Sequence, residues 1–265
     1  MGVGRNLWAF FWGVLVAVLG GLIGVGGAEF RLPILVSFFN FRTLQAVMIN
    51  LIISLVTVTF SLLFRSGVLG LEGVVAHWFV VINILAGSLF GSYLGVNYAT
   101  RIHEQLLHRV VVVFLIFLSF VLLGHHWVFS FGSFQWPLPL QVMAGLIAGV
   151  VIGIFSSMLG VAGGELIIPT IILIFAVDIK LAGSLSLVIS MPTILMGLFK
   201  FSKNHRLKEI KSERTLMIFM GVGSIVGALI GSNLLRYVSS TMLYYILGGI
   251  LLLSAFKLAH HRPVS

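Results

Sequence analysis

The chain has 265 residues, of which 59% are hydrophobic and 9% are charged, and its mean hydropathy is +1.16. A soluble domain carries roughly a quarter charged residues, so this composition excludes a protein whose surface mostly faces water. The net charge of +9 does not indicate nucleic-acid binding, because the basic residues lie between long apolar runs, as in the cytoplasmic loops of membrane proteins. Since the chain has no cysteine, it has no disulfide and no cysteine-ligated metal site.

Long apolar runs are the main feature of the chain, and a bilayer-spanning helix needs about 20 such residues. Eight runs are candidates for spanning helices: 7–24, 44–64, 74–98, 107–124, 140–159, 182–199, 216–235 and 243–258. Two further runs, 30–39 and 166–177, are too short to cross comfortably as straight helices.

The two halves of the chain are copies of one unit. A shift of 136 residues, which places residue 24 on residue 160, aligns 24–29 with 160–165, Pro33 with Pro169, and Asn97 with Asn233. We therefore predict an all-α polytopic membrane protein of two tandem repeats of about 130 residues, each with four long transmembrane helices and one short helix interrupted by Gly and Pro. We assign 1–124 to the first repeat, 125–139 to the loop between the repeats and 140–265 to the second, all within one integrated membrane domain.

The orientation of the copies depends on whether the short runs cross. If they do not, each half has four spans and the halves are parallel. If they do, the halves are inverted; Arg42, Arg101 and Arg109 then join the cytoplasmic side and Arg65 leaves it. The enrichment of Lys and Arg in cytoplasmic loops favours the inverted arrangement, and both arrangements place the two termini in the cytoplasm.

The glycine clusters at 24–28 and 160–164 must interrupt the helices that contain them. An unbroken helix from Asn6 to Asn40 would be about 52 Å long, against a hydrocarbon core of about 30 Å. We expect Pro33 and Pro169 in the first turns of the new short helices, whose free N–H groups attract anions. Paired interrupted segments indicate a transporter's binding site; the alternative is close helix packing alone.

Matched polar residues accompany the glycines. Glu29 and Glu165 are either proton carriers or caps of the short helices, and the two roles are compatible. Asn50 and Ser186 either contact solute or bond a neighbouring helix. The candidate substrate-binding residues are Gly24, Gly26, Gly27, Glu29, Pro33, Asn50, Gly160, Gly163, Gly164, Glu165, Pro169 and Ser186.

Small residues also recur every four positions in two pairs of runs. One pair is Gly87, Gly91, Gly95 and Gly223, Gly227, Gly231; the other is Ala9, Gly13, Ala17 and Gly145, Gly149, Gly153. We interpret these ladders as surfaces where helix backbones approach closely. Asn97 and Asn233 end the first pair and either line a path or cap the helices.

The paired clusters, each followed by a short run to Pro33 or Pro169 and then by the elements 46–51 and 182–187, resemble the sulfite exporter TauE/SafE family, also called the toluene sulfonate uptake permease family. The resemblance covers nearly the whole chain. It implies a transporter of sulfur-containing or organic anions, such as sulfite or sulfonates, in a prokaryotic plasma membrane. Ala28 and Ala162 replace family glycines, and Ile49-Asn50 and Leu185-Ser186 replace the family's Thr-Ser pair.

We therefore expect a secondary transporter of a small anion that works by alternating access at the repeat interface, without a cofactor, unless protons are coupled to transport. The expected partners are the anionic solute, the lipid bilayer and a second copy of the chain in a homo-oligomer, but not nucleic acid. The alternatives are a structural or receptor-like membrane protein and an intramembrane enzyme. The enzyme is disfavoured because Asp178 is the only aspartate and the notable polar residues form symmetric pairs, which give no catalytic set. No spacing of His, Asp and Glu indicates a metal site.

Overall fold

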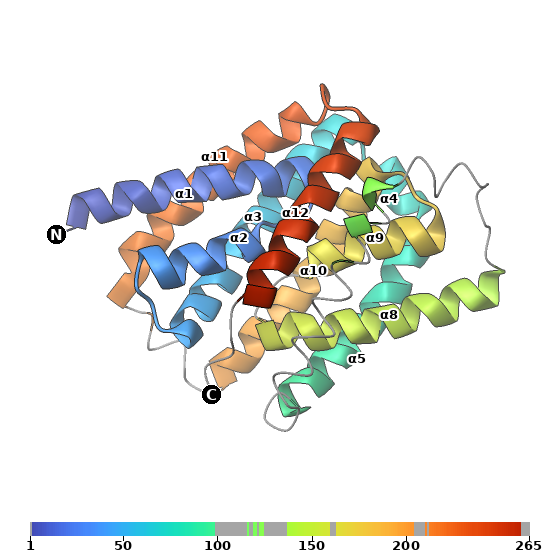
Figure 1. The fold of residues 1–265 in the computed structure, drawn as a ribbon, viewed down its shortest axis with the longest axis horizontal. Helices are drawn as coiled ribbons and strands as arrows, with labels where there is room; N and C mark the ends of the chain where they lie inside the picture. The colour runs from blue at the N-terminus through green and yellow to red at the C-terminus, as the bar shows by residue number, and fades with distance from the viewer. Residues whose placement is uncertain are drawn as a thin grey trace.

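The protein is a bundle of helices, seen in a computed structural model that describes residues 2–98, 116, 119–120, 122–124, 137–159, 163–203, 210 and 212–260 (Figure 1). Within these residues there is no β-strand. The first half contains α1 (Gly2–Ile23), α2 (Ala28–Pro33), the π-helix η1 (Ile34–Phe38), α3 (Thr43–Leu69), α4 (Glu72–Ala76) and α5 (Trp78–Tyr98). The second half contains α8 (Leu138–Leu159), α9 (Gly164–Phe175), α10 (Ile179–Lys203), α11 (Arg214–Leu234) and α12 (Ser240–His260).

The helices agree with the predicted membrane architecture. Five of them are long and apolar enough to cross a bilayer, with spans at 4–23, 45–69, 138–156, 179–199 and 214–234, and three shorter apolar helices cover 78–93, 164–175 and 240–253. Of the eight expected runs, the one at 107–124 lies mostly outside the described residues, as does the expected loop at 125–139 apart from its last three residues.

The internal duplication is repeated in the helix boundaries. α8 begins 136 residues after α1 (138 against 2), and the same difference separates α9 from α2 (164 against 28), α10 from α3 (179 against 43) and α11 from α5 (214 against 78). The alignment of sequence halves therefore corresponds to an alignment of helices. The chain is confirmed as a two-repeat helical membrane protein.

Each half packs its first long helix on the third long run of the other half. α1 lies along α11, where Gly223, Gly227 and Gly231 face the backbone of Phe10, Val14 and Val18 in that order (Figure 1). The equivalent pair α5 and α8 does the same, with Gly87 on Leu146 and Gly91 on Val150. The small-residue ladders are thus close-packing surfaces, as predicted, and each pair of helices runs in the same direction.

The two copies are inverted relative to each other. α3 and α10 are equivalent helices, yet Arg65 near the end of α3 bonds Ser184 near the start of α10, whereas Leu51 near the start of α3 contacts Gly197 near the end of α10. Equivalent helices that pack antiparallel belong to repeats of opposite orientation. This is the arrangement that the distribution of Lys and Arg favoured.

The short segments return alongside the first helix of their half. Phe38 at the end of η1 makes ring contacts with Trp8 and Trp12, so α2 and η1 lead back toward the start of α1. The expectation for the prolines was wrong by one turn: Pro33 ends α2 and Pro169 lies within α9, each the sixth residue of its helix, counted from Ala28 and Gly164. Because proline has no N–H, it leaves the carbonyl four residues earlier without its helical donor, and after Pro33 the chain continues as the π-helix η1.

Candidate functional site

The two glycine interruptions meet at the centre of the bundle. Gly163 and Gly27, the residues that precede α9 and α2, have φ of 72° and 71°, and Gly24 and Gly26 also have positive φ. A side chain is strained in this left-handed region, which explains why glycine occupies these positions.

Close backbone contacts fix the same interruptions to each other. A Cβ on Gly164 would lie 2.7 Å from the carbonyl oxygen of Val25, and Gly24 lies against the backbone of Gly183 in α10. The first of these contacts joins the short segments of the two repeats. Gly160, also a predicted site residue, lies outside the described residues.

Beside this meeting point lies a buried cation, Arg31 of α2, whose side chain is 0% exposed. Its Nη1 donates to Ser54 Oγ at 3.0 Å and to Asn50 Oδ1 at 3.4 Å, and its Nη2 donates to Thr57 Oγ1 at 3.0 Å. We call these four residues the Arg31 cluster. All three acceptors come from one face of α3 and are neutral.

The guanidinium of Arg31 keeps unused donors. It has five N–H groups, and three hydrogen bonds use its terminal nitrogens, so Nε–H and one N–H of Nη2 have no partner in the described part of the chain. No carboxylate of a described residue lies within ion-pair distance of Arg31. Among the described residues, Arg5 and Glu213 form an ion pair at 3.2 Å, away from this cluster. Nε–H and Nη2 share the edge of the guanidinium that binds two oxygens of an oxyanion at once.

Asn50 connects the cluster to the helix interruption. Its Nδ2 donates to the carbonyl of Ala28, the first residue of α2, at 3.0 Å, while its Oδ1 accepts from Arg31. Of the two roles predicted for Asn50, bonding to a neighbouring segment is therefore observed. Its repeat counterpart Ser186 is also buried, but its Oγ has no partner among the described residues.

Glu29 lies on another side of α2. Its carboxylate oxygens are buried and neither has a hydrogen-bond partner in the part of the chain that the structure describes. A carboxylate that capped α2 would accept from the first N–H groups of that helix, and neither oxygen of Glu29 has such a partner. The cap is therefore not seen at Glu29, and its role as a proton carrier stays a prediction. The repeat counterpart Glu165 is buried at 6% exposure in the first turn of α9.

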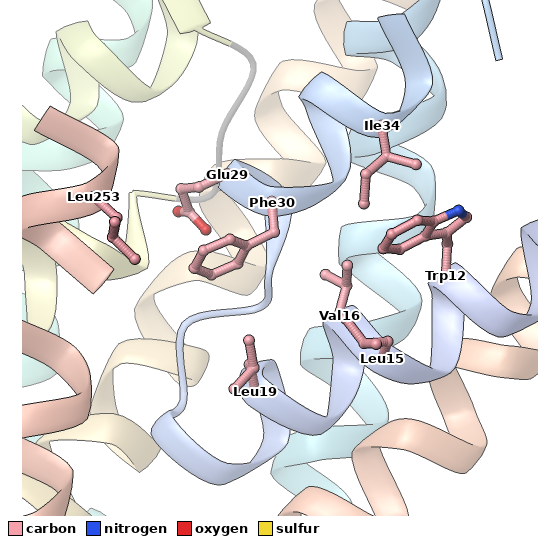
Figure 2. Close-up of a pocket in the computed structure, with 8 residues that line it drawn as sticks. All are labelled: Trp12, Leu15, Val16, Leu19, Glu29, Phe30, Ile34 and Leu253. Carbon is pink, nitrogen blue, oxygen red and sulfur yellow. The ribbon is translucent and has the colours of Figure 1, made fainter. Parts of the chain in front are cut away.

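A cavity of about 290 Å³ adjoins Glu29. Its wall is apolar, with Val16 and Leu19 from α1, Phe30 from α2 and Leu253 from α12. Figure 2 shows the carboxylate of Glu29 directed toward the space between Phe30 and Leu253. Glu29 is thus the one ionisable residue in the lining of this cavity.

A second buried cation, Arg65, has a different environment. Its Nη1 donates to the carbonyls of Gly21 and Leu22 at 3.0 and 2.9 Å, and its Nε donates to Ser184 Oγ at 3.1 Å. These carbonyls belong to the last turn of α1, where a helix end attracts positive charge. Arg65 therefore stabilises the end of α1 before the glycine interruption and ties it to α10.

The sequence interpretation missed both buried arginines. It treated Arg65 as a loop charge on one side of the membrane, and it did not consider Arg31 as a site residue. Their repeat counterparts are Phe201 and Ile167, so a search for matched polar pairs passed over them. Both arginines could have been found from their positions within or beside an apolar run, because a charge there is costly in a membrane and usually functional.

Comparison with known proteins identifies the family of this chain. The family model for sulfite exporter TauE/SafE matches residues 2–122 and 144–264, one stretch in each half of the chain. No curated protein matches the chain, and no solved structure matches it. Because the matched stretches cover most of the sequence, the chain belongs to the sulfite exporter TauE/SafE family, a family of membrane transporters of sulfur-containing anions.

Proposed function

We propose that the chain is a secondary transporter of a small anion, with sulfite and sulfonates as the first candidates, and that the anion binds at the Arg31 cluster. The observation that carries this proposal is that Arg31 is buried and forms no ion pair with a carboxylate of a described residue. Burying a cation costs several kcal/mol unless an opposite charge compensates it, and the neutral oxygens of Asn50, Ser54 and Thr57 supply none. An anionic solute would supply it.

The hydrogen bonding of Arg31 supports the same conclusion. Within the described residues, its Nε–H and one N–H of its Nη2 have no partner. These donors lie on the edge of the guanidinium that binds two oxygens of an oxyanion at once. Arg65 is the natural comparison, because it lies at the negative end of α1 and its donors are directed to backbone carbonyls and one hydroxyl.

Alternating access is supported by the inverted repeats and by the burial of the site. Since Arg31 is fully buried, an anion would reach it only after the segments around the glycine interruptions move apart. Inverted repeats provide two equivalent ways of opening, one toward each side of the membrane. The contact between Val25 and Gly164 is where the two short segments would separate.

The remaining predicted residues take supporting roles in this proposal. Gly24, Gly26, Gly27, Gly163 and Gly164 permit the interruptions, and Asn50 aligns Arg31 with the start of α2. We assign the chain to a prokaryotic plasma membrane with both termini in the cytoplasm, on the distribution of Lys and Arg along the sequence.

Flux through the reconstituted protein tests the proposal. The purified chain in liposomes is assayed for uptake of sulfite, thiosulfate, methanesulfonate and acetate, with protein-free liposomes as the background. We expect saturable uptake of at least one sulfur oxyanion. A charge-assisted hydrogen bond contributes about 1.5–3 kcal/mol, so Arg31→Gln should reduce uptake at limiting substrate at least about tenfold.

Two further variants make this result specific. Arg31→Lys keeps the charge but loses two-point binding, and should retain part of the uptake. Arg42→Gln removes an exposed positive charge from the same half and should leave uptake unchanged. Uptake by Arg31→Gln equal to that of the wild type would refute the site, and wild-type uptake no faster than the background would refute transport and favour a receptor-like protein.

A further inference from the structure

We infer that Glu29 is a proton-binding residue that couples proton movement to anion movement, so that one proton and one anion cross the membrane together. This inference rests on the proposed function, because it requires an anion at Arg31. Binding is simple protonation: the carboxylate of Glu29 takes up a proton on one side and releases it on the other, and no other bond changes.

The surroundings of Glu29 are those of a group that must change its charge or find a partner. Both carboxylate oxygens are buried and accept no hydrogen bond from a described residue. A buried carboxylate in such surroundings is strongly disfavoured in its charged form, whereas a neutral carboxyl group is tolerated. The adjoining cavity of about 290 Å³ has Glu29 as the one ionisable residue in its lining.

The charged groups near Glu29 are few. α1 presents Trp12, Val16 and Leu19, and α12 presents Leu253, none of which titrates. On α2 itself the one charged neighbour is Arg31, two residues further along the helix. Within the described residues the charge of Glu29 therefore acts mainly on Arg31 and is affected mainly by it.

These two groups couple the proton to the anion. When Glu29 is ionised, it compensates the charge of Arg31 and repels an anion that approaches the cluster. When Glu29 is protonated, Arg31 has no counter-charge, and the anion is the ion that restores neutrality. Protonation and anion binding therefore favour each other, and by thermodynamic linkage the effect is reciprocal. Charge compensation across one helix is effective here because the region is apolar.

The second repeat lacks this pair. Its glutamate is kept as Glu165, but the position equivalent to Arg31 is Ile167. Glu29 is thus the one of the two matched glutamates with an arginine two residues further along its helix. The coupling that we infer therefore involves one proton at Glu29 and one anion at Arg31.

A proton gradient across liposomes tests the coupling. The membrane potential is held at zero with potassium and valinomycin, and accumulation is measured for each anion among sulfite, thiosulfate and methanesulfonate that the wild type carries. With one proton for each anion, an inward gradient of one pH unit should drive about tenfold accumulation in the wild type. Glu29→Gln imitates the protonated residue, and should exchange anion across the membrane without accumulating it.

Three comparisons decide the outcome. Glu29→Asp keeps a titratable carboxyl group and should retain accumulation. Glu72→Gln removes an exposed carboxylate at the start of α4 and should behave as the wild type. The coupling is refuted if Glu29→Gln accumulates anion like the wild type, or if the wild type carries anion but ignores the pH gradient.

Loss of all exchange in a folded Glu29→Gln protein, with wild-type thermal stability, would also refute the coupling. It would show that Glu29 is needed for anion passage rather than for proton binding. In each of these outcomes the wild type still carries anion, so the proposed transport function stands. If the wild type carries no anion at all, it is the proposed function that fails.

Discussion

Replacement of Gly227 by alanine should separate α1 from α11. A Cβ at position 227 would overlap the carbonyl oxygen of Val14 and lie 2.9 Å from Cβ of Ala17, so both obstacles belong to the rigid part of α1. No rotation of a side chain relieves this overlap. The two helices must move apart along a surface where Gly223 and Gly231 make the same kind of contact.

The loss of stability in Gly227→Ala can be worked out by comparison with another glycine of α11. Gly221 of α11 has no atom within 4 Å of the position that a Cβ would take. Gly221→Ala and Gly227→Ala both gain the greater helix propensity of alanine, about 1 kcal/mol, so this gain cancels when the two are compared. The remaining difference is the cost of overpacking, which should make Gly227→Ala less stable than Gly221→Ala by about 1–3 kcal/mol.

Thermal unfolding of the purified variants in detergent measures this difference. For a chain of this size each kcal/mol corresponds to about 2–4 °C, and Gly227→Ala should melt below Gly221→Ala accordingly. Gly91, the counterpart of Gly227 in the equivalent α5–α8 interface, should behave like Gly227 because its Cβ would overlap the backbone of Val150. Equal melting temperatures for the 221 and 227 variants would refute the close-packing account of the ladders.

The other buried polar residues give further expectations. Arg65→Gln should lower the free energy of unfolding by about 1–3 kcal/mol or more, because the carbonyls of Gly21 and Leu22 lose their charged donor; denaturation that matches the wild type would contradict this. Asn50→Ala should both destabilise the chain by about 1–2 kcal/mol and weaken anion uptake, since Asn50 bonds α2 and Arg31 together. Its counterpart change Ser186→Ala should alter stability by less than about 0.5 kcal/mol, because that hydroxyl makes no hydrogen bond to a described residue, and a larger loss would reveal a partner.

Much of the fold was predictable because the duplication places each long apolar run at an equivalent position in both halves. Each long apolar run in one half has a counterpart 136 residues away (160 against 24), and the described helices begin at the same spacing. The glycine clusters were also informative, because a helix too long for the membrane must be interrupted where the backbone can leave helical geometry. The orientation of the repeats needed tertiary contacts, and Arg65 with Ser184 supplied one.

The Arg31 cluster was not predicted, because the reasoning that revealed the repeats concealed it. A symmetric search selects residues that both halves share, whereas a transport site needs only one cation for one anion. Asn50 was selected through its match with Ser186, but its importance comes from Arg31 and Ala28, which have Ile167 and Gly164 as counterparts. The turn position of Pro33 was missed as well, because the sequence does not show that the left-handed Gly27 alone begins the helix.

Equilibrium binding tests most directly whether Arg31 holds the transported anion. Titration of sulfite into the detergent-solubilised wild type, Arg31→Gln and Arg42→Gln separates binding from movement across the membrane. We expect the Kd of Arg31→Gln to rise at least about tenfold, the equivalent of about 1.4 kcal/mol, while Arg42→Gln binds as the wild type does. Sulfite binding of equal affinity in the wild type and Arg31→Gln would contradict the account.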